Sequence, residues 1–360
     1  MSESIPSLHV IGSKAMGGAE RWFVRFLRAM QAQGEPVQAI VRRDSALAGI
    51  SLGEVSTALA AMRTVWDPWS KIDLARLVQA SGAPVVQTYM GRATRLLRLP
   101  AQRGRIHVAR LGGYYKVQPF RNAHAWIGNT RGLCDWLVSQ GLPADRVHHI
   151  YNFADPARPV RDDELAACRR AVGASPEDVL LVTAGRLIDV KGHRFVLDAM
   201  TRLPRAIDGR RPRLLVLGDG PLLPALLEQA RQTGIAERVT WLGWQDDPAP
   251  WFALADMVVF PSREAETLGN VILEAWAHGK PLVTAAFRGA REIARHGEDA
   301  WVVPCDDGPA LAQGIAAVLA NAALARALAR AGRTRVATDF GETAIIGQYR
   351  ALYAHLADHG

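Results

Sequence analysis

Short apolar runs rich in β-branched residues alternate with longer amphipathic stretches along the whole chain. The apolar runs predict strands at Leu8–Gly12, Pro36–Val41, Pro84–Thr88, Arg105–Ala109, Ala125–Gly128, Val179–Ala184, Arg213–Gly218, Val239–Leu242, Asp256–Pro261, Pro281–Thr284 and Ala300–Pro304. Amphipathic stretches such as Ala19–Gln33, Pro68–Ser81 and Arg131–Gln140 predict helices between them. Strands that alternate with helices indicate βαβ units, so we expect an α/β protein with parallel sheets.

The chain divides near Asn152–Pro159, where two prolines separate two such patterns. A length of 360 residues suits two domains, at about 100–200 residues each. We expect an N-terminal domain over 1–155 and a C-terminal domain over 156–340, both Rossmann-like and doubly wound, facing a central cleft. The tail, 341–360, predicts a helix that returns to the first domain on an apolar face of Ile345, Ile346, Tyr349, Leu352 and Tyr353.

Composition narrows the class of protein. Hydrophobic residues make up 49% of the chain and charged residues 22%, which is typical of a globular protein. No uncharged apolar run reaches the roughly 18 residues of a membrane-spanning helix, and the first residues lack the pattern of a secretory signal. Cys134, Cys168 and Cys305 lie far apart, which argues against a disulfide framework or a structural zinc site. We therefore expect a cytoplasmic protein.

The positive charge lies in the first half. Residues 1–155 carry 19 Lys and Arg against 10 Asp and Glu, whereas the remainder carries 24 against 25. Two basic sets predict charged helix faces, namely Arg92, Arg95, Arg98, Arg103 and Arg105, and Arg21, Arg25 and Arg28. Such faces are either simply solvated or contact an anionic membrane surface or acidic glycan. Nucleic acid is disfavoured as a partner because no RNA- or DNA-binding motif and no interleaved aromatic residues accompany the charge.

The second half carries the candidate chemistry. Arg186 follows the strand Val179–Ala184, and Lys191 comes at the start of the next helix. Two cations beside a helix N-terminus form an anion site, although surface charges at a βα turn are the alternative interpretation.

A second segment, Glu266–Glu274, follows the buried strand that ends at Phe260. Asn270 is the predicted N-cap of a helix whose free N–H groups favour phosphate oxygens. Glu274, about one turn further on, is placed to accept both hydroxyls of a ribose, and Glu266 to reach a sugar on the diphosphate. The alternative is that both carboxylates only favour the helix dipole.

Taken together, these motifs resemble glycosyltransferase family 4. The resemblance rests on Gly185-Arg186, Lys191-Gly192, Gly218-Asp219-Gly220-Pro221, Asp256, Phe260-Pro261-Ser262, Glu266, Glu274-Ala275 and Arg288–Val303. It covers about residues 180–320 strongly, and the first half more loosely through Gly17-Gly18-Ala19-Glu20. The family implies a GT-B fold and a retaining enzyme that takes its sugar from a nucleotide, UDP or GDP, without a metal or other cofactor.

The resemblance also implies roles for single residues. Arg186, Lys191 and Glu266 are the implied catalytic residues, by neutralising the diphosphate and holding the sugar. The implied donor-binding set adds Gly17, Gly18, Gly218, Leu268, Gly269, Asn270 and Glu274. This chain has Thr267 where the family often has glycine, a departure that bears on the choice of sugar.

The acceptor is expected in the first half. Arg92 and the loop Arg110–Lys116, with Gly113 and Tyr114, combine cations, aromatic faces and flexibility, although an ordinary surface turn fits the same loop. Where many relatives carry a histidine after the fourth strand, this chain reads Gln87–Arg92, so no general base is identified. His124 is interpreted as a structural histidine. Retention without a protein nucleophile implies front-side displacement.

Basic charge and resemblance together predict a glycan or lipid-linked acceptor, such as a lipopolysaccharide core, at the inner face of the cell membrane. Two alternatives remain at this point, a sugar-nucleotide epimerase of the same architecture and a basic nucleic-acid-binding protein. No metal is expected, and Asp246-Asp247 and Asp306-Asp307 are interpreted as turn or cap residues.

Overall fold

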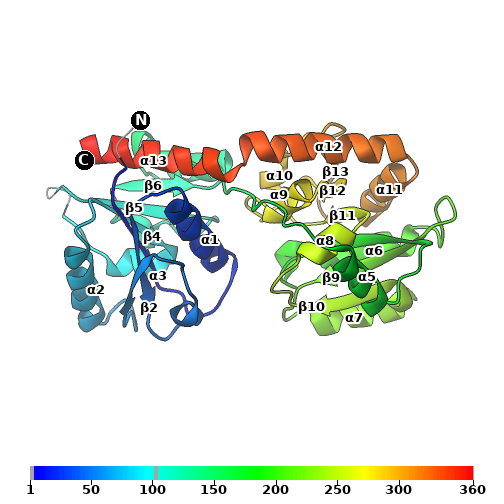
Figure 1. The fold of residues 1–360 in the computed structure, drawn as a ribbon, viewed down its shortest axis with the longest axis horizontal. Helices are drawn as coiled ribbons and strands as arrows, with labels where there is room; N and C mark the ends of the chain where they lie inside the picture. Colours follow the sequence, from blue (N-terminus) through cyan, green and yellow to red (C-terminus); the bar gives the residue numbers. More distant parts are fainter. Residues whose placement is uncertain (1–3, 101–103, 360) are drawn as a thin grey trace. The chain divides into compact units, whose positions relative to one another are not determined.

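The computed structural model describes residues 4–100 and 104–359. They form two compact units (Figure 1): an N-terminal unit up to Asn152 that also includes the chain from Glu342, and a C-terminal unit over Phe153–Gly341. These limits lie close to the predicted domain boundaries. Each unit is built on one parallel sheet.

The sheet of the N-terminal unit has seven strands in the order β3-β2-β1-β4-β5-β6-β7. The strands are β1 Ser7–Ile11, β2 Val37–Arg42, β3 Ser56–Ala60, β4 Val85–Tyr89, β5 Ile106–Leu111, β6 Ala125–Gly128 and β7 Val147–His149. The helices are α1 Gly18–Ala32, α2 Pro68–Ser81, α3 Met90–Leu96, α4 Arg131–Ser139 and α13 Glu342–His359. Strands β1, β4 and β5 are buried along their whole length, as expected for a sheet covered on both faces.

The sheet of the C-terminal unit has six strands in the order β10-β9-β8-β11-β12-β13. The strands are β8 Asp178–Ala184, β9 Arg211–Leu217, β10 Val239–Gly243, β11 Met257–Phe260, β12 Leu282–Ala285 and β13 Trp301–Val303. The helices are α5 Asp162–Ala171, α6 His193–Arg202, α7 Leu223–Gln232, α8 Ala249–Leu254, α9 Asn270–Ala277, α10 Arg288–Ile293, α11 Gly308–Leu319 and α12 Ala322–Asp339. Apolar residues of β8, β9, α6 and α11 share one core, so the central strands hold the loops at their ends in fixed positions.

The eleven predicted strands are all present, and two others were missed. β3 has the small, polar sequence Ser56–Ala60 and lies at the sheet edge with most of its residues exposed. β7 is only three residues long and reads Val147-His148-His149 at the opposite edge. Neither segment has the apolar run that predicts a strand, because an edge strand buries less of its surface.

The predicted basic helix through Arg92–Arg105 is wrong. Helix α3 ends at Leu96, and Leu97 is already extended, with φ −77° and ψ 126°. Pro100 lacks the N–H that would continue the helix, and the residues before a proline are biased towards the extended backbone that Leu97 has. Arg98 and Arg105 therefore do not share the helix with Arg92 and Arg95, and Arg103 lies outside the described residues.

The predicted C-terminal helix packs on the N-terminal unit, where it contacts α1 and β4. Figure 1 shows this helix, α13, lying across that unit. Its predicted apolar face, Ile345, Ile346, Tyr349, Leu352 and Tyr353, is buried. The Tyr353 hydroxyl donates to Oε1 of Gln87 at 2.9 Å, which anchors the helix on β4.

Within 4–100 and 104–359, no single helix is long and apolar enough to cross a membrane. One pair, α11 and the segment Ala322–Asp358, meets the length and composition criterion only when joined across a bend of 100°. The apolar residues of α11, among them Leu311 and Ile315, are buried in the core of the C-terminal unit.

Candidate active site

The topology of the C-terminal sheet defines where a ligand binds. Strand order reverses between β8 and β11, so the loops that leave their carboxyl ends run in opposite directions. In open α/β sheets, the space between two such loops is the crevice in which ligands bind. Lys191 lies on the loop after β8, and Glu266 on the loop after β11. The two side chains meet, with the Lys191 ammonium nitrogen 2.6 Å from Oε2 of Glu266.

The Lys191–Glu266 pair is only partly open to solvent. The exposed fraction is 20% for the lysine side chain and 14% for the glutamate. The hydroxyl of buried Ser262 donates to the same carboxylate oxygen at 3.3 Å, and the ammonium lies 5.4 Å from the centroid of the Phe260 ring. Because an ammonium carries three donors, a bond to Glu266 leaves capacity for an anion in the crevice.

Gly192 allows the two loops to lie against each other. Its φ is +65°, and a Cβ there would stand 2.0 Å from the carbonyl oxygen of Pro261. The backbone N–H of Arg263 donates to the Val190 carbonyl at 2.9 Å, and the Arg263 guanidinium forms ion pairs with Asp189 and Asp306. Backbone contact and ion pairs together hold Lys191 beside Glu266.

Arg186 presents a guanidinium to solvent. It follows β8 directly and is exposed, and no hydrogen bond or ion pair joins its side chain to any other described residue. It lies on the same loop as Lys191, between β8 and α6. Two cations on one loop are suited to a doubly charged phosphate group.

Helix α9 begins differently from the prediction. Gly269, not Asn270, is the N-cap, with φ +78° and ψ 68°, and no side chain caps the first turn. A Cβ on Gly269 would stand 2.5 Å from Cζ of Phe287 and 2.9 Å from Cε1 of Phe260, so only glycine fits this left-handed position. Glycine itself has no side chain to cap the first turn, whose backbone N–H groups are the donors that an anion site at a helix N-terminus uses.

The other donor-binding candidates of this unit surround the same loops. Gly218 has φ +135°, and a Cβ there would stand 2.0 Å from the Gly185 carbonyl oxygen, so the loop after β9 touches the loop after β8. Leu268 is 2% exposed, which leaves only its backbone for ligand contact. Glu274 is half-buried in the second turn of α9. These residues, namely Arg186, Lys191, Gly218 and the segment from Glu266 to Glu274, thus all follow the carboxyl ends of β8, β9 and β11.

The predicted residues of the N-terminal unit lie at its own strand ends. Gly17 is the N-cap of α1 with an extended φ of −157°, and a Cβ on Gly18 would meet open space, so neither position requires glycine for its backbone. Arg92 of α3 donates from Nη1 to the carbonyl oxygens of Met62 and Arg63 at 3.2 and 2.5 Å. These two bonds, close to the end of β3, occupy part of the Arg92 guanidinium.

Arg110 has a packing role. It is 5% exposed, it donates to the Tyr349 hydroxyl at 2.9 Å and to the Asn152 side chain, and its guanidinium lies 4.6 Å from the Trp22 ring centroid. These contacts tie β5 to α13, so little of the guanidinium is available to an acceptor. Gly113 is buried, and the half-buried Tyr114 ring packs on Trp136 at 5.4 Å.

The interpretation of His124 as structural is confirmed. Its Nδ1 accepts from the His107 backbone N–H at 3.2 Å, and its Nε2 lies 3.1 Å from the Leu99 carbonyl oxygen. Both ring nitrogens are engaged, which leaves no atom for base catalysis.

Two residues of the site, Arg263 and His193, were not singled out from the sequence. Arg263 positions the loop of Glu266, and Ser262, which the resemblance already included, bonds to Glu266 itself. His193 opens α6 and is 3% exposed. Burial, and next the charge of Lys191, lower the pKa of His193 to about 4, so it is neutral at physiological pH.

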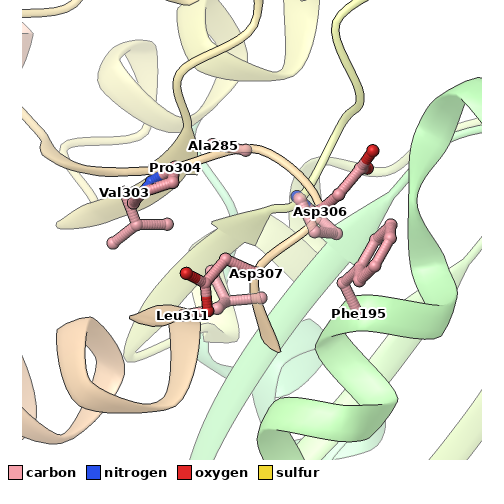
Figure 2. Close-up of a pocket in the computed structure, with 8 residues that line it drawn as sticks. Phe195, Ala285, Val303, Pro304, Asp306, Asp307 and Leu311 are labelled. Carbon is pink, nitrogen blue, oxygen red and sulfur yellow. The ribbon is translucent and has the colours of Figure 1, made fainter. Parts of the chain in front are cut away.

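A shallow pocket adjoins these loops and is too small for a nucleotide sugar. Its enclosed volume is about 0 Å³, against the roughly 300–1,000 Å³ of ligand pockets. Figure 2 shows Val303 and Pro304, at the end of β13, on one side and Phe195 of α6 on the other. Its carboxylates are engaged, since Asp306 pairs with Arg263 and Asp307 accepts from the Ala310 N–H at 2.8 Å.

The carboxylates suspected as turn or cap residues have those roles. Asp307 caps α11, and Asp247 accepts from the Ala249 N–H at 3.0 Å. Over the described ranges, no group of three or more His, Cys, Asp or Glu residues is arranged to hold a metal ion.

Sequence comparison shows which proteins the chain is similar to. Residues 178–321, which include β8 through α11, match the model of the family described as glycosyl transferases group 1. The chain is 29% identical to a lipopolysaccharide core biosynthesis glycosyltransferase, LpsE, of Rhizobium meliloti, over 94% of this chain and 96% of that one. LpsD of the same organism, with the same description, is 27% identical over 94% of this chain and 95% of its own length.

Solved structures establish the fold. HepE of Anabaena, crystallised with UDP and glucose, superposes with a TM-score of 0.83 at 18% identity, covering 98% of this chain and all of that one. WaaG, a glycosyltransferase involved in lipopolysaccharide biosynthesis, superposes with a TM-score of 0.73 at 16% identity, covering 96% of this chain and 99% of its own. The chain therefore has the GT-B fold that the resemblance implied.

Proposed function

We propose that this protein is a glycosyltransferase that moves a hexose from a nucleotide-sugar donor, linked to UDP or GDP, to a glycan or lipid-linked acceptor such as a lipopolysaccharide core. It does so with retention of configuration and without a metal. The observation that carries the proposal is the meeting of Lys191 with Glu266, beside the uncapped start of α9 and the exposed Arg186. Cations and helix amides at one sheet edge suit a diphosphate, and carboxylates beside them suit sugar hydroxyls.

The relatives support the same substrates. LpsE and LpsD are described as enzymes of lipopolysaccharide core biosynthesis, and they match nearly the whole chain. HepE was crystallised with UDP and glucose. A nucleotide-linked hexose and a core glycan are therefore the first substrates to test.

The proposed mechanism assigns a task to each group of the crevice. Lys191, Arg186 and the first amides of α9 bind the diphosphate and stabilise its growing charge as the bond between the sugar C1 and the phosphate oxygen breaks. The departing diphosphate oxygen takes the proton of the acceptor hydroxyl, whose oxygen bonds to C1 on the same face. Glu274 holds the ribose, and Glu266 holds hydroxyls of the sugar. Rate enhancement comes from positioning and fixed charge.

Acceptor contacts are proposed for the N-terminal unit. Arg92, Gly113 and Tyr114 remain acceptor candidates and Gly17 and Gly18 donor candidates, while the buried contacts of Arg110 favour a packing role for it. With 19 basic against 10 acidic residues, the first 155 residues favour an acidic acceptor and a peripheral position at the inner face of the cell membrane.

Replacing the cations tests the diphosphate contact. We expect Lys191→Ala and Arg186→Ala each to reduce transfer from the nucleotide sugar by about 100-fold or more, because each removes fixed charge from the developing diphosphate. Arg194→Ala is the matched control, since Arg194 is an exposed cation of the neighbouring helix and lies outside the crevice. Thermal melting checks that each variant is folded. Near-normal turnover of folded Lys191→Ala would contradict the assigned role.

Nucleotide binding tests the ribose contact separately. A thermal-shift panel of UDP, GDP, ADP and their sugars identifies the base, and the same ligands are then titrated against Glu274→Ala. We expect its affinity for the preferred nucleotide to fall about tenfold, because a carboxylate bonded to a ribose contributes roughly 1.5–3 kcal/mol. Glu237→Ala is the control, because Glu237 is an exposed glutamate that is distant from Glu274 in the sequence. Equal affinity in both variants would remove Glu274 from the donor site. Incubation of donor with and without acceptor distinguishes transfer from epimerisation.

A further inference from the structure

Exposed apolar side chains concentrate in one short segment of the N-terminal unit. Among the described residues, eight large hydrophobic side chains are exposed, and four of them lie within residues 59–72. These are Leu59, Trp66, Trp69 and Ile72, with exposed fractions of 41%, 78%, 72% and 43%. The other four are scattered over both units, so this segment is the one contiguous group.

The two tryptophans do not belong to the core of the unit. Trp66 lies on the loop between β3 and α2, and Trp69 and Ile72 lie on α2. At 100° per residue, Trp69, Ile72 and Arg76 occupy the face of α2 opposite the buried Ser70, Leu74 and Val78. Helix α2 thus packs on the sheet through one face and presents indole, isoleucine and guanidinium to the solvent through the other.

The same surface is cationic. Arg63 and Arg76 are both exposed, and Arg76 shares the outward face of α2 with Trp69 and Ile72. The Arg95 guanidinium of α3 lies 5.3 Å from the centroid of the Trp66 ring. We call the group formed by Arg63, Trp66, Trp69, Ile72 and Arg76 the Trp66 patch.

Both carboxylates of the segment are engaged inside it. Asp67 caps α2 by accepting from the Trp69 N–H at 3.1 Å and the Ser70 hydroxyl at 2.7 Å, and the Ser70 bond lowers the pKa of Asp67. Asp73 accepts from the Ala61 N–H at 3.1 Å. Asp67 and Asp73 are both partly buried, so the exposed charged side chains of the Trp66 patch are its two arginines.

We propose that the Trp66 patch docks this protein on an anionic lipid surface. Tryptophan prefers the boundary between headgroups and acyl chains, and lysine and arginine beside it pair with lipid phosphates while their aliphatic stems cover apolar surface. The combination of indoles, an aliphatic isoleucine and exposed cations matches that boundary. A surface that stacks nucleic-acid bases or sugars has no use for the exposed Ile72 and Leu59. The inference extends the proposed function, because a lipid-linked acceptor lies at such a surface.

Co-sedimentation of the full chain with vesicles tests the proposal without donor or acceptor. Vesicles of phosphatidylcholine alone are compared with vesicles containing 30% phosphatidylglycerol, a composition of roughly the charge that attracts basic segments. We expect binding to the anionic vesicles only, falling about tenfold between low and high salt. Trp66→Ser/Trp69→Ser should lower the partition coefficient about tenfold or more, because two indoles no longer leave water. Trp244→Ser, another exposed tryptophan at 49%, is the matched control.

A charge-reversed pair completes the experiment. Arg63→Glu/Arg76→Glu should abolish the preference for anionic vesicles, whereas Arg326→Glu/Arg330→Glu, two exposed arginines on α12, should leave it unchanged. Vesicle binding that ignores lipid charge, or that survives in Trp66→Ser/Trp69→Ser, would overturn the proposal.

Transfer to a delipidated core oligosaccharide, measured in parallel, separates docking from the proposed function. If the wild type transfers sugar to this acceptor but does not bind anionic vesicles, docking is wrong and the proposed function stands. If the wild type binds anionic vesicles through the Trp66 patch but transfers no sugar, docking stands and the proposed function is wrong.

Discussion

At the scale of single residues, the site depends on glycines whose surroundings differ. Gly192 and Gly173 have nearly the same backbone, with φ +65° and +58°. A Cβ on Gly173 would meet nothing within 4 Å, but on Gly192 it would meet the Pro261 carbonyl oxygen at 2.0 Å. Backbone strain is therefore common to both positions, and the steric conflict belongs to Gly192 alone.

This pair predicts a difference in stability and activity. Gly173→Ala should lower the free energy of unfolding by about 1 kcal/mol, the cost of a left-handed backbone for a residue with a Cβ. Gly192→Ala should lower it by at least about 2 kcal/mol more, because the loop after β8 must move off the loop after β11. Since Lys191 moves with that loop, transfer activity should fall as well. Urea unfolding of the two variants measures the difference, and equal midpoints would show that the loops are not in such close contact.

At the scale of the element, α13 shows how an amphipathic helix is fixed in place. Its apolar face is readable from the sequence, but its polar contacts are not. Tyr353 and Tyr349, buried within that face, reach Gln87 and Arg110 with their hydroxyls, and Arg350 forms an ion pair with Glu35. These partners are more than 200 residues away in sequence, and only the folded unit brings them together.

Truncation of this face should be costly. Ile346 is fully buried, so Ile346→Ala should lower the free energy of unfolding of the N-terminal unit by about 2–5 kcal/mol. Gln348→Ala, two residues along and exposed, should change it by less than about 0.5 kcal/mol. Denaturation of the full chain, followed by circular dichroism, compares the two. A small effect of Ile346→Ala would mean that α13 contributes little to the unit on which it packs.

At the scale of the whole molecule, buried histidines make stability depend on pH. Burial lowers the pKa of His9 and of His107 to about 3, and that of His193 to about 4. In the unfolded chain each has the ordinary value of about 6.5. The unfolded state therefore binds more protons below pH 6.5, and the stabilisation present above that pH is lost as the pH falls towards the folded values.

We expect the melting temperature to fall steadily from pH 7 to pH 4.5. For every pH unit below about 6.5, each such histidine lowers the free energy of unfolding by about 1.4 kcal/mol. Among the described residues, neither ring nitrogen of His193 has a hydrogen-bond partner, so His193→Leu removes the titration without breaking a bond. The variant should lose less stability than the wild type between pH 6.5 and 4.5. Parallel pH profiles would refute the low pKa of His193.

The sequence alone determined the architecture and the loops on which the candidate donor residues lie. Alternating apolar and amphipathic runs require parallel sheets, because only burial on both faces accommodates a strand such as Met257–Phe260. Residues that follow parallel strands must lie at the carboxyl end of the sheet, so the sequence places Lys191 and Glu266 at the same end.

Tertiary structure decided what local pattern does not encode. The edge strands β3 and β7 exist because neighbouring strands offer them hydrogen bonds, not because their own residues favour a strand. Gly269 caps α9 because the rings of Phe260 and Phe287 fill the space around it. Arg110 is buried because α13 returns from the far end of the chain to cover it. Such outcomes depend on contacts between segments distant in sequence, and hydrophobic periodicity reports only on each segment's own faces.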